Sequence, residues 1–285
     1  MSGPAAAMSG TVVAAVLAAA LMHAGWNAML KTRGDAFLST VAVAVSAGLL
    51  CAFALPFVAQ PAPASWPYIA ASATIHVVYY ALLMSTYREG DVSHAYPLMR
   101  GCAPLLIAAC GMVFMGEHLA PPQWLAICLI CAGVLAMAGH RRGAPSGQRR
   151  TTLLALASAC SIAAYTLVDG AGVRMSGAPG GYTMWIFALA ALGVAALAGR
   201  RRREALAFVH RNPALPGGGA MSVGAYWVAL WAMTQAPVAA VAALRETSIL
   251  FATAIALLVL RERVGPLRLA GAALIACGAV AMRLH

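Results

Sequence analysis

Residues 116–137 read GEHLAPPQWLAICLICAGVLAM, and residues 261–282 read RERVGPLRLAGAALIACGAVAM. The two stretches align without a gap at a constant offset of 145 residues. Apolar matches arise easily in such sequences, but charged matches do not, because charges are rare in membrane spans. The charged and proline matches are Arg100 with Arg245, Glu117 with Glu262, and Pro121 with Pro266. We therefore interpret the chain as a tandem duplication.

The composition around these stretches indicates a protein of the lipid bilayer. Of the 285 residues, 62% are hydrophobic and 9% are charged, whereas soluble domains average about 45–50% apolar and roughly 25% charged residues. This composition excludes an ordinary soluble domain, a disordered chain and a disulfide-stapled secreted domain. Because about 20 apolar residues cross a bilayer as a helix, the chain is long enough to cross it many times.

Ten apolar runs of spanning length follow one another, separated by Gly, Pro and Asp residues at which helices stop. They cover residues 11–30, 36–58, 66–87, 92–115, 121–139, 151–173, 181–199, 214–236, 238–260 and 265–284. We predict an all-α integral membrane protein of ten transmembrane helices. A first five-helix repeat spans residues 1–139, a linker spans 140–150, and a second repeat spans 151–285. An odd number of spans per unit inverts the second copy relative to the first, as in many secondary transporters.

The basic residues lie mostly in short connections between the apolar runs, so the formal charge of +11 does not indicate nucleic-acid binding. One side carries Lys31, Arg33, Arg88, Arg141, Arg142, Arg149, Arg150, Arg200, Arg201, Arg202, Arg203, Arg211, Arg261 and Arg263; the other carries Arg174 and Arg283. Because cytoplasmic loops are rich in Lys and Arg, this distribution predicts that both termini lie outside the cytoplasm.

Polar and aromatic side chains recur at helical spacing within several predicted spans. They are His23, Trp26 and Asn27; His76, Tyr79 and Tyr80; Tyr96 and Arg100; Tyr165 and Asp169; Tyr226; and Arg245. Such groups either join helices by hydrogen bonds or contact a ligand, and both interpretations stay open. The fourth span also carries Pro97, Gly101 and Pro104, which predict a bent or discontinuous helix beside a cavity. We predict that the twelve residues line a substrate site.

The two arginines within spans are the sharpest signal. An Arg at the centre of a span costs about 2.5–3.5 kcal/mol on insertion scales, so it is expected to face the bundle interior and to have a partner. One interpretation is an ion pair with Asp169 or Glu246. The other is a fork that receives an acidic group of the substrate, since guanidinium binds planar anions through two parallel hydrogen bonds.

Buried carboxyl groups are also candidates for proton exchange during transport. We name Asp169 and Glu246 as the candidates for proton coupling. Glu117 and Glu262 follow the fourth and ninth spans and are interpreted as helix-end residues bound to neighbouring backbone or Arg. The sequence indicates no cofactor and no metal site.

At this point the chain resembles a known family. The ends of both repeats, together with HAGWNAMLK at 23–31 and YREGDVSHAYPLMRGCAPLL at 87–106, are similar to the EamA-type proteins of the drug/metabolite transporter superfamily. The resemblance implies alternating access by rocking of the repeats, with export of a metabolite or amino acid and in some cases proton exchange. Better-known members are described with cytoplasmic termini, which is the reverse of the charge count.

We therefore expect a secondary transporter, most readily an exporter, of a small polar metabolite such as an amino acid or a related zwitterion or anion. Its expected place is the inner cell membrane, and its partners are the substrate and the bilayer. The sequence does not define the oligomeric state, and a monomer is compatible with it. The alternatives are a membrane-embedded enzyme acting on a lipid and a passive channel. Neither HExxH nor GxSxG occurs in the chain, so we expect no enzyme.

Overall fold

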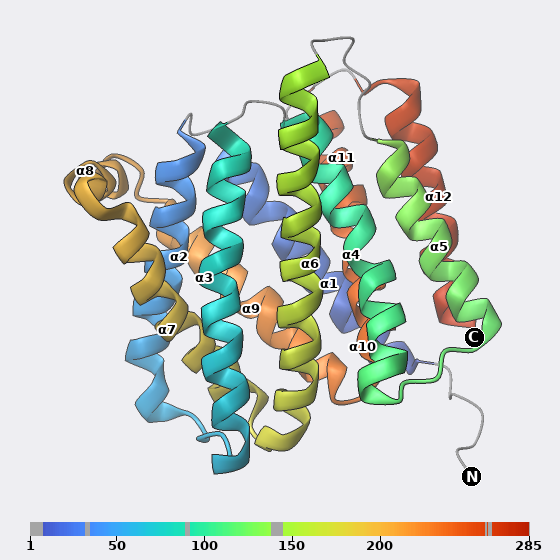
Figure 1. Ribbon diagram of the computed structural model, residues 1–285, viewed down its shortest axis with the longest axis horizontal. Helices are drawn as coiled ribbons and strands as arrows, with labels where there is room; N and C mark the ends of the chain where they lie inside the picture. The colour runs from blue at the N-terminus through green and yellow to red at the C-terminus, as the bar shows by residue number, and fades with distance from the viewer. Residues whose placement is uncertain are drawn as a thin grey trace.

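The computed structural model describes residues 8–31, 35–88, 92–137, 145–259, 261 and 264–284, and these residues form helices without any strand. The helices pack side by side into a bundle (Figure 1). They are α1 (Gly10–Lys31), α2 (Ala36–Ala54), η1 (Leu55–Phe57), η2 (Pro63–Ser65), α3 (Trp66–Arg88), α4 (Val92–Met115), α5 (Pro121–Ala136), α6 (Pro145–Ser176), α7 (Pro179–Ala198), η3 (Gly199–Arg201), α8 (Arg202–Arg211), α9 (Leu215–Met233), α10 (Val238–Arg245), α11 (Ser248–Leu258) and α12 (Pro266–Leu284).

Within the described residues, eight helical segments are long and apolar enough to cross a membrane. They include α1 to α4, α6, α7, the α10–α11 segment and α12. The apolar helix α5 is shorter, with 16 residues, and α9 is not among the eight. The described residues thus form a multi-pass, all-helical membrane protein in which eight of the ten predicted spans meet this criterion, while the fifth and the eighth stay predictions.

The ninth predicted span, 238–260, was expected to be one continuous helix, and that expectation is wrong. The helix breaks between α10 and α11 at Glu246 and Thr247. Around the break the backbone closes tight i to i−3 hydrogen bonds, with Glu246 N–H donating to Ala243 O and Ile249 N–H donating to Glu246 O. Such short-pitch turns inside a helix often mark a functional hinge.

The fourth span shows the opposite result. We expected Pro97, Gly101 and Pro104 to bend or interrupt it, and the structure shows no interruption, because α4 continues as one helix through both prolines; a bend stays a prediction. The discontinuity that the sequence suggested for α4 lies instead in its repeat partner, beside Arg245. The predicted linker also differs, because residues 145–150 belong to α6, which begins at Pro145; a proline is well suited to a first helical turn.

A short helix that the sequence analysis missed, α8, follows α7. Its exposed residues include Arg202, Arg203, Glu204 and Arg211, and it buries only Ala205 among its side chains. Figure 1 shows α8 lying to one side at the upper end of the bundle. Asp35, the residue before α2, accepts hydrogen bonds from Leu38 N–H at 3.0 Å and from Arg201 Nη2 at 3.0 Å. This contact joins the start of α8 to the start of α2.

The two stretches that define the repeat, α5 and α12, pack against each other in antiparallel orientation (Figure 1). Their glycines make this close approach possible. A β-carbon on Gly133 would lie 2.6 Å from Gly271 O and 2.8 Å from Ile275 Cγ1, while one on Gly278 would lie 2.8 Å from Ala126 O and 2.6 Å from Ile130 Cγ1. Residues 133 and 278, 126 and 271, and 130 and 275 are each 145 positions apart, so the two contacts are equivalent when the helices are exchanged. Packing about a local two-fold axis requires this equivalence.

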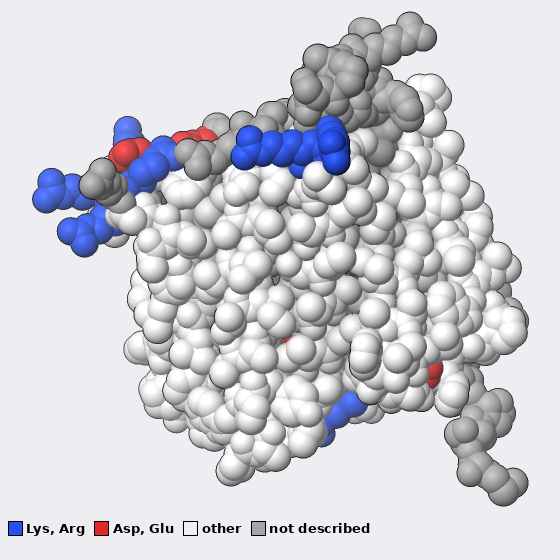
Figure 2. Space-filling view, in the orientation of Figure 1, with Lys and Arg blue, Asp and Glu red and all other residues white. Residues whose placement is uncertain are grey.

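The charges are distributed unequally between the two ends of the bundle. Figure 2 shows Lys and Arg gathered along the upper end, with few at the lower end. We call the upper end, which carries Arg201, Arg202, Arg203 and Arg211, the cation-rich end. The lower end, where α6 ends and α10 begins, is the cation-poor end. Several predicted cations, including Arg33 and Arg263, lie outside the described residues.

Candidate functional site

A cavity of about 100 Å³, counted as the space open to the centres of water molecules, lies among α1, α2, α3, α4, α6, α7, α9 and α10. By this measure one water needs roughly 10–15 Å³, so the cavity holds several waters or a small metabolite. Both halves of the chain contribute to its wall. In α1 to α3 the wall residues include Asn27, Thr40 and Leu83, which lie toward the cation-rich ends of those helices.

The structure brings together on this wall all but one of the twelve predicted site residues. They are His23, Trp26, Asn27, His76, Tyr79, Tyr80, Tyr96, Arg100, Tyr165, Tyr226 and Arg245. Asp169 is not on the wall, because it lies fully buried behind Tyr226. Glu246, the second candidate for proton coupling, is also off the wall. Substrate binding by these residues stays a prediction.

The sequence analysis missed part of the wall. The missed residues are Thr40, Val43, Leu83, Ile186, Phe187, Ala190 and Ser222. Most are apolar, and apolar residues carry no distinguishing signal in a chain composed largely of them. Thr40 and Ser222 are common in spans, where a hydroxyl often bonds the preceding turn, as Thr40 Oγ1 does with Ala36 O.

Aromatic rings form a connected cluster beside the cavity. The His76 ring stacks on Tyr165 with centroids 4.1 Å apart and meets Tyr226 edge-on at 5.7 Å. Tyr79 packs edge-on against Tyr165 at 5.8 Å, and Phe187 against Tyr226 at the same distance. His76 Nδ1 lies 2.9 Å from Ser72 O, which holds the ring on its own helix. The wall of the cavity on this side is therefore a packed aromatic cluster.

Arg100 on α4 is already paired. Its Nε lies 2.9 Å from Glu246 Oε2, at ion-pair distance but outside hydrogen-bond alignment, and its Nη2 donates to Ser248 Oγ at 3.4 Å. Both charged residues are more than nine-tenths buried. The pair ties α4 of the first half to the hinge between α10 and α11. Of the ion-pair interpretations considered, the structure shows the one with Glu246.

Arg245 on α10 differs from Arg100. Its guanidinium carbon lies 5.2 Å from the centroid of the Tyr226 ring, a cation–π contact. No carboxylate of the described residues forms an ion pair with it, and its side chain is only partly buried on the cavity wall. Arg245 thus lies on the cavity wall without an ion-pair partner among the described residues.

Asp169 on α6 is held by two phenols instead of a cation. Tyr182 Oη donates to its Oδ1 at 3.1 Å, and Tyr226 Oη donates to its Oδ2 at 2.5 Å. Both Asp169 and Tyr182 are fully buried. Tyr226 also lines the cavity, so its hydroxyl is the connection between Asp169 and the cavity.

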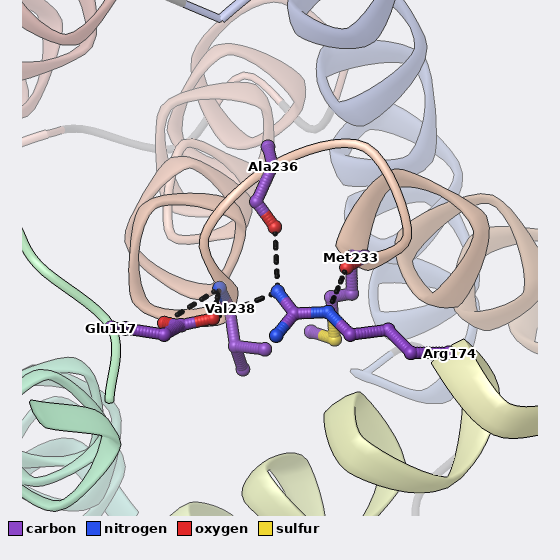
Figure 3. Close-up of polar contacts among 5 residues, drawn as sticks. All are labelled: Glu117, Arg174, Met233, Ala236 and Val238. Carbon is purple, nitrogen blue, oxygen red and sulfur yellow. Dashed lines mark hydrogen bonds and ion pairs between the residues drawn. The ribbon is translucent and has the colours of Figure 1, made fainter. Parts of the chain in front are cut away.

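A second polar cluster lies at the cation-poor end (Figure 3). Glu117 accepts hydrogen bonds from Val238 N–H at 2.9 and 3.0 Å and forms an ion pair with Arg174 at 2.8 Å. Arg174 also donates to the backbone carbonyls of Met233 at 2.9 Å and Ala236 at 3.0 Å. The cluster joins the end of α4, the end of α6 and the turn before α10. It matches the interpretation of Glu117 as a helix-end residue; Glu262 lies outside the described residues.

No group of three or more His, Cys, Asp or Glu side chains suited to a metal ion occurs in the described ranges. The fold and the cavity together define a multi-pass membrane protein with a cavity whose wall comes from both of its halves. A family model for the EamA-like transporter family matches residues 10–139 and again residues 149–284. The chain therefore belongs to the EamA-like transporter family.

Solved structures show the same fold. A crystal structure described only as that of a protein superposes with a TM-score of 0.74 at 18% sequence identity and covers 96% of both chains. This likeness concerns the fold alone. Among curated proteins, none matches this chain.

Proposed function

We propose that this protein is a secondary transporter that moves a small metabolite with an acidic group, such as an amino acid or a related zwitterion or anion, by alternating access. One observation carries the proposal. Arg245 lies in the wall of a cavity built by both halves of the bundle, and it forms no ion pair with a carboxylate of the described residues. A cation at membrane depth is costly, so a cavity that retains one is suited to an anionic group.

We further propose that the two halves are inverted five-helix repeats. The reciprocal contacts of Gly133 and Gly278 support this arrangement. A two-fold axis that exchanges two antiparallel helices runs perpendicular to both, and such an axis relates inverted repeats. Two such repeats that rock against each other would expose the cavity to each side in turn. Export is the direction that we propose from the family.

The cluster around Glu117 supplies a closure at one end. It crosses between the halves, because Glu117 belongs to the first and Val238 and Arg174 to the second. These bonds hold the cation-poor end together while the cavity lies nearer the other end. For the substrate to leave at the cation-poor end, the bonds of Glu117 and Arg174 would have to break.

We propose Asp169 as the group for proton coupling, with Glu246 as the second candidate. Asp169 reaches the cavity through the Tyr226 hydroxyl, and the Tyr226 ring also contacts Arg245. A substrate on Arg245 and a proton on Asp169 would thus both act on Tyr226, the first at its ring and the second at its hydroxyl group. Glu246 is less accessible, because Arg100 occupies it.

The experiment is counterflow of labelled acidic metabolites in proteoliposomes containing the purified protein. We expect saturable uptake that is driven by the same solute inside the vesicle, and at least a tenfold loss in the Arg245→Gln variant, since a hydrogen bond to a charged group contributes about 1.5–3 kcal/mol. Arg202→Gln is the matched control, because it removes an equal charge from the exposed surface of α8. Uptake without saturation would indicate a channel. Turnover of a lipid in detergent would indicate an enzyme.

A further inference from the structure

The cavity wall contains cations but no acid. Its charged or titratable members are Arg100, Arg245, His23, His76 and five tyrosines, and neither Asp nor Glu is among its residues. One of the two arginines is neutralised by Glu246. The other arginine, Arg245, forms no ion pair with a carboxylate of the described residues and is left to contact a ligand.

The two carboxyl groups nearest the cavity are both occupied by other groups. Asp169 accepts from Tyr182 and Tyr226 and has no exposed surface. Glu246 is 5% exposed, forms an ion pair with Arg100 and is not a residue of the cavity wall. To bind a ligand ammonium ion, either carboxyl group would have to give up its present partner and leave a buried Tyr or Arg unsatisfied.

Apolar side chains of α2, α3 and α7 form one face of the wall, beside Thr40 of α2 and the His76, Tyr79 and Tyr80 side chains of α3. This face consists of Val43, Leu83, Ile186, Phe187 and Ala190. Arg245 comes from α10. A ligand that fills the cavity would thus have an apolar body on one side and an anionic group on the other.

From these charges we infer that the substrate is a small organic anion with an apolar body and no ammonium group. The inference rests on the proposed function and narrows it, because it excludes the amino acids that the proposal admits. Arg245 receives the anionic group, and the α2–α7 face receives the body. A zwitterion is disfavoured because its ammonium group would enter the cavity without a carboxylate partner. An unpaired charge of this kind lowers the affinity of a site for the wrong ligand.

The test uses matched compounds with one body and three head groups. 4-Methyl-2-oxopentanoate, leucine and 3-methylbutylamine share the isobutyl body, and phenylpyruvate, phenylalanine and phenethylamine share the benzyl body. Each competes against the acidic solute that shows counterflow. We expect the oxo acids to compete at least about tenfold better than the amino acids, a difference of about 1.4 kcal/mol. The amines should not compete.

Three variants and one control sharpen the result. Arg245→Gln should abolish competition by the oxo acids, while Arg245→Lys should keep part of it, because lysine retains the charge but not the fork. Asn27→Asp adds an acid to the wall without a change of size and should narrow the preference for oxo acids over amino acids. Arg202→Gln should leave the preference unchanged.

Amino acids that compete as well as the oxo acids in the wild-type protein would overturn the inference and leave the proposed function intact. Competition by the amines would also overturn it. An unchanged preference for oxo acids in the Arg245→Gln variant would do the same, provided that this variant elutes and unfolds like the wild-type protein. Absence of counterflow for every solute would instead contradict the proposed function.

Discussion

The helix α4 and the α10–α11 segment are equivalent parts of the two copies, but they differ in continuity and in the surroundings of their arginines. Arg100 lies inside a continuous α4 and is neutralised, whereas Arg245 ends α10 at a break and faces the cavity without an acid. By contrast, α5 and α12 keep their equivalence, because a β-carbon on Gly133 or on Gly278 would lie at nearly the same distances from the facing helix. The comparison indicates that the scaffold between the repeats has stayed symmetric while the site has not.

The largest effect is expected from breaking the Arg100–Glu246 pair. Glu246→Gln leaves the Arg100 charge buried without a partner and should destabilise the protein by about 3–5 kcal/mol. Arg100→Met combined with Glu246→Leu removes both charges and should recover most of that loss. Thermal unfolding in detergent measures both variants. If the double variant also retains anion counterflow, Arg245 alone is sufficient for binding, whereas loss of counterflow in a folded double variant would make Arg100 part of the binding site.

The next effect concerns the bond by which one half restrains the other. Glu117→Gln removes the charge that Arg174 and Val238 N–H contact and should cost about 1.5–3 kcal/mol, as expected for hydrogen bonds to a charged group. Glu204→Gln is the matched control, because Glu204 pairs with Arg201 on an exposed surface, where such pairs contribute little. Equal unfolding temperatures for the two variants would contradict a restraining role for Glu117.

The symmetric interface is tested with alanine. Gly133→Ala and Gly278→Ala each place a methyl group against backbone oxygen of the facing helix, and overpacking of this kind typically costs about 1–3 kcal/mol. Because the contacts are reciprocal, the two losses should agree closely. Gly217→Ala on α9 meets nothing within 4 Å and should have little effect. A loss in only one of the two variants would show that the equivalence of α5 and α12 is superficial.

The smallest effect is a pH dependence at the cation-rich end. Burial acts to raise the pKa of Asp35, but the Leu38 N–H hydrogen bond and Arg201 outweigh it, so the pKa lies below its ordinary value of 3.8. The contribution of Asp35 to stability is therefore complete above pH 3.8 and is lost as the pH falls through the lowered pKa. Because the pair is partly exposed, we expect less than about 1 kcal/mol. Asp35→Asn should abolish this part of the acid dependence of unfolding, and an unchanged profile would contradict the assignment.

Much of the site could be predicted because polar residues are conspicuous in apolar spans. His76 and Tyr79, one turn apart, and the unusual Arg245 were visible for that reason. Phe187 and Ile186 could not be found in the same way, since nothing distinguishes a wall residue from a packed one in an apolar helix. The break at Glu246 could not be predicted either. The helix-breaking residues Pro97 and Pro104 lie in α4, and the Arg100 contact beside the break joins residues far apart in the chain.

The sequence by itself determined that this chain is helical, lies in a membrane, is duplicated and carries its cations mainly at one end. These properties follow from composition, offset and charge position, which are local and additive. Only the tertiary structure decided which arginine is neutralised, that Asp169 lies behind Tyr226, and that Glu117 binds the start of α10. Each of these depends on which side chains meet across helices more than 50 residues apart, and pairings over that distance are set by packing of the whole bundle.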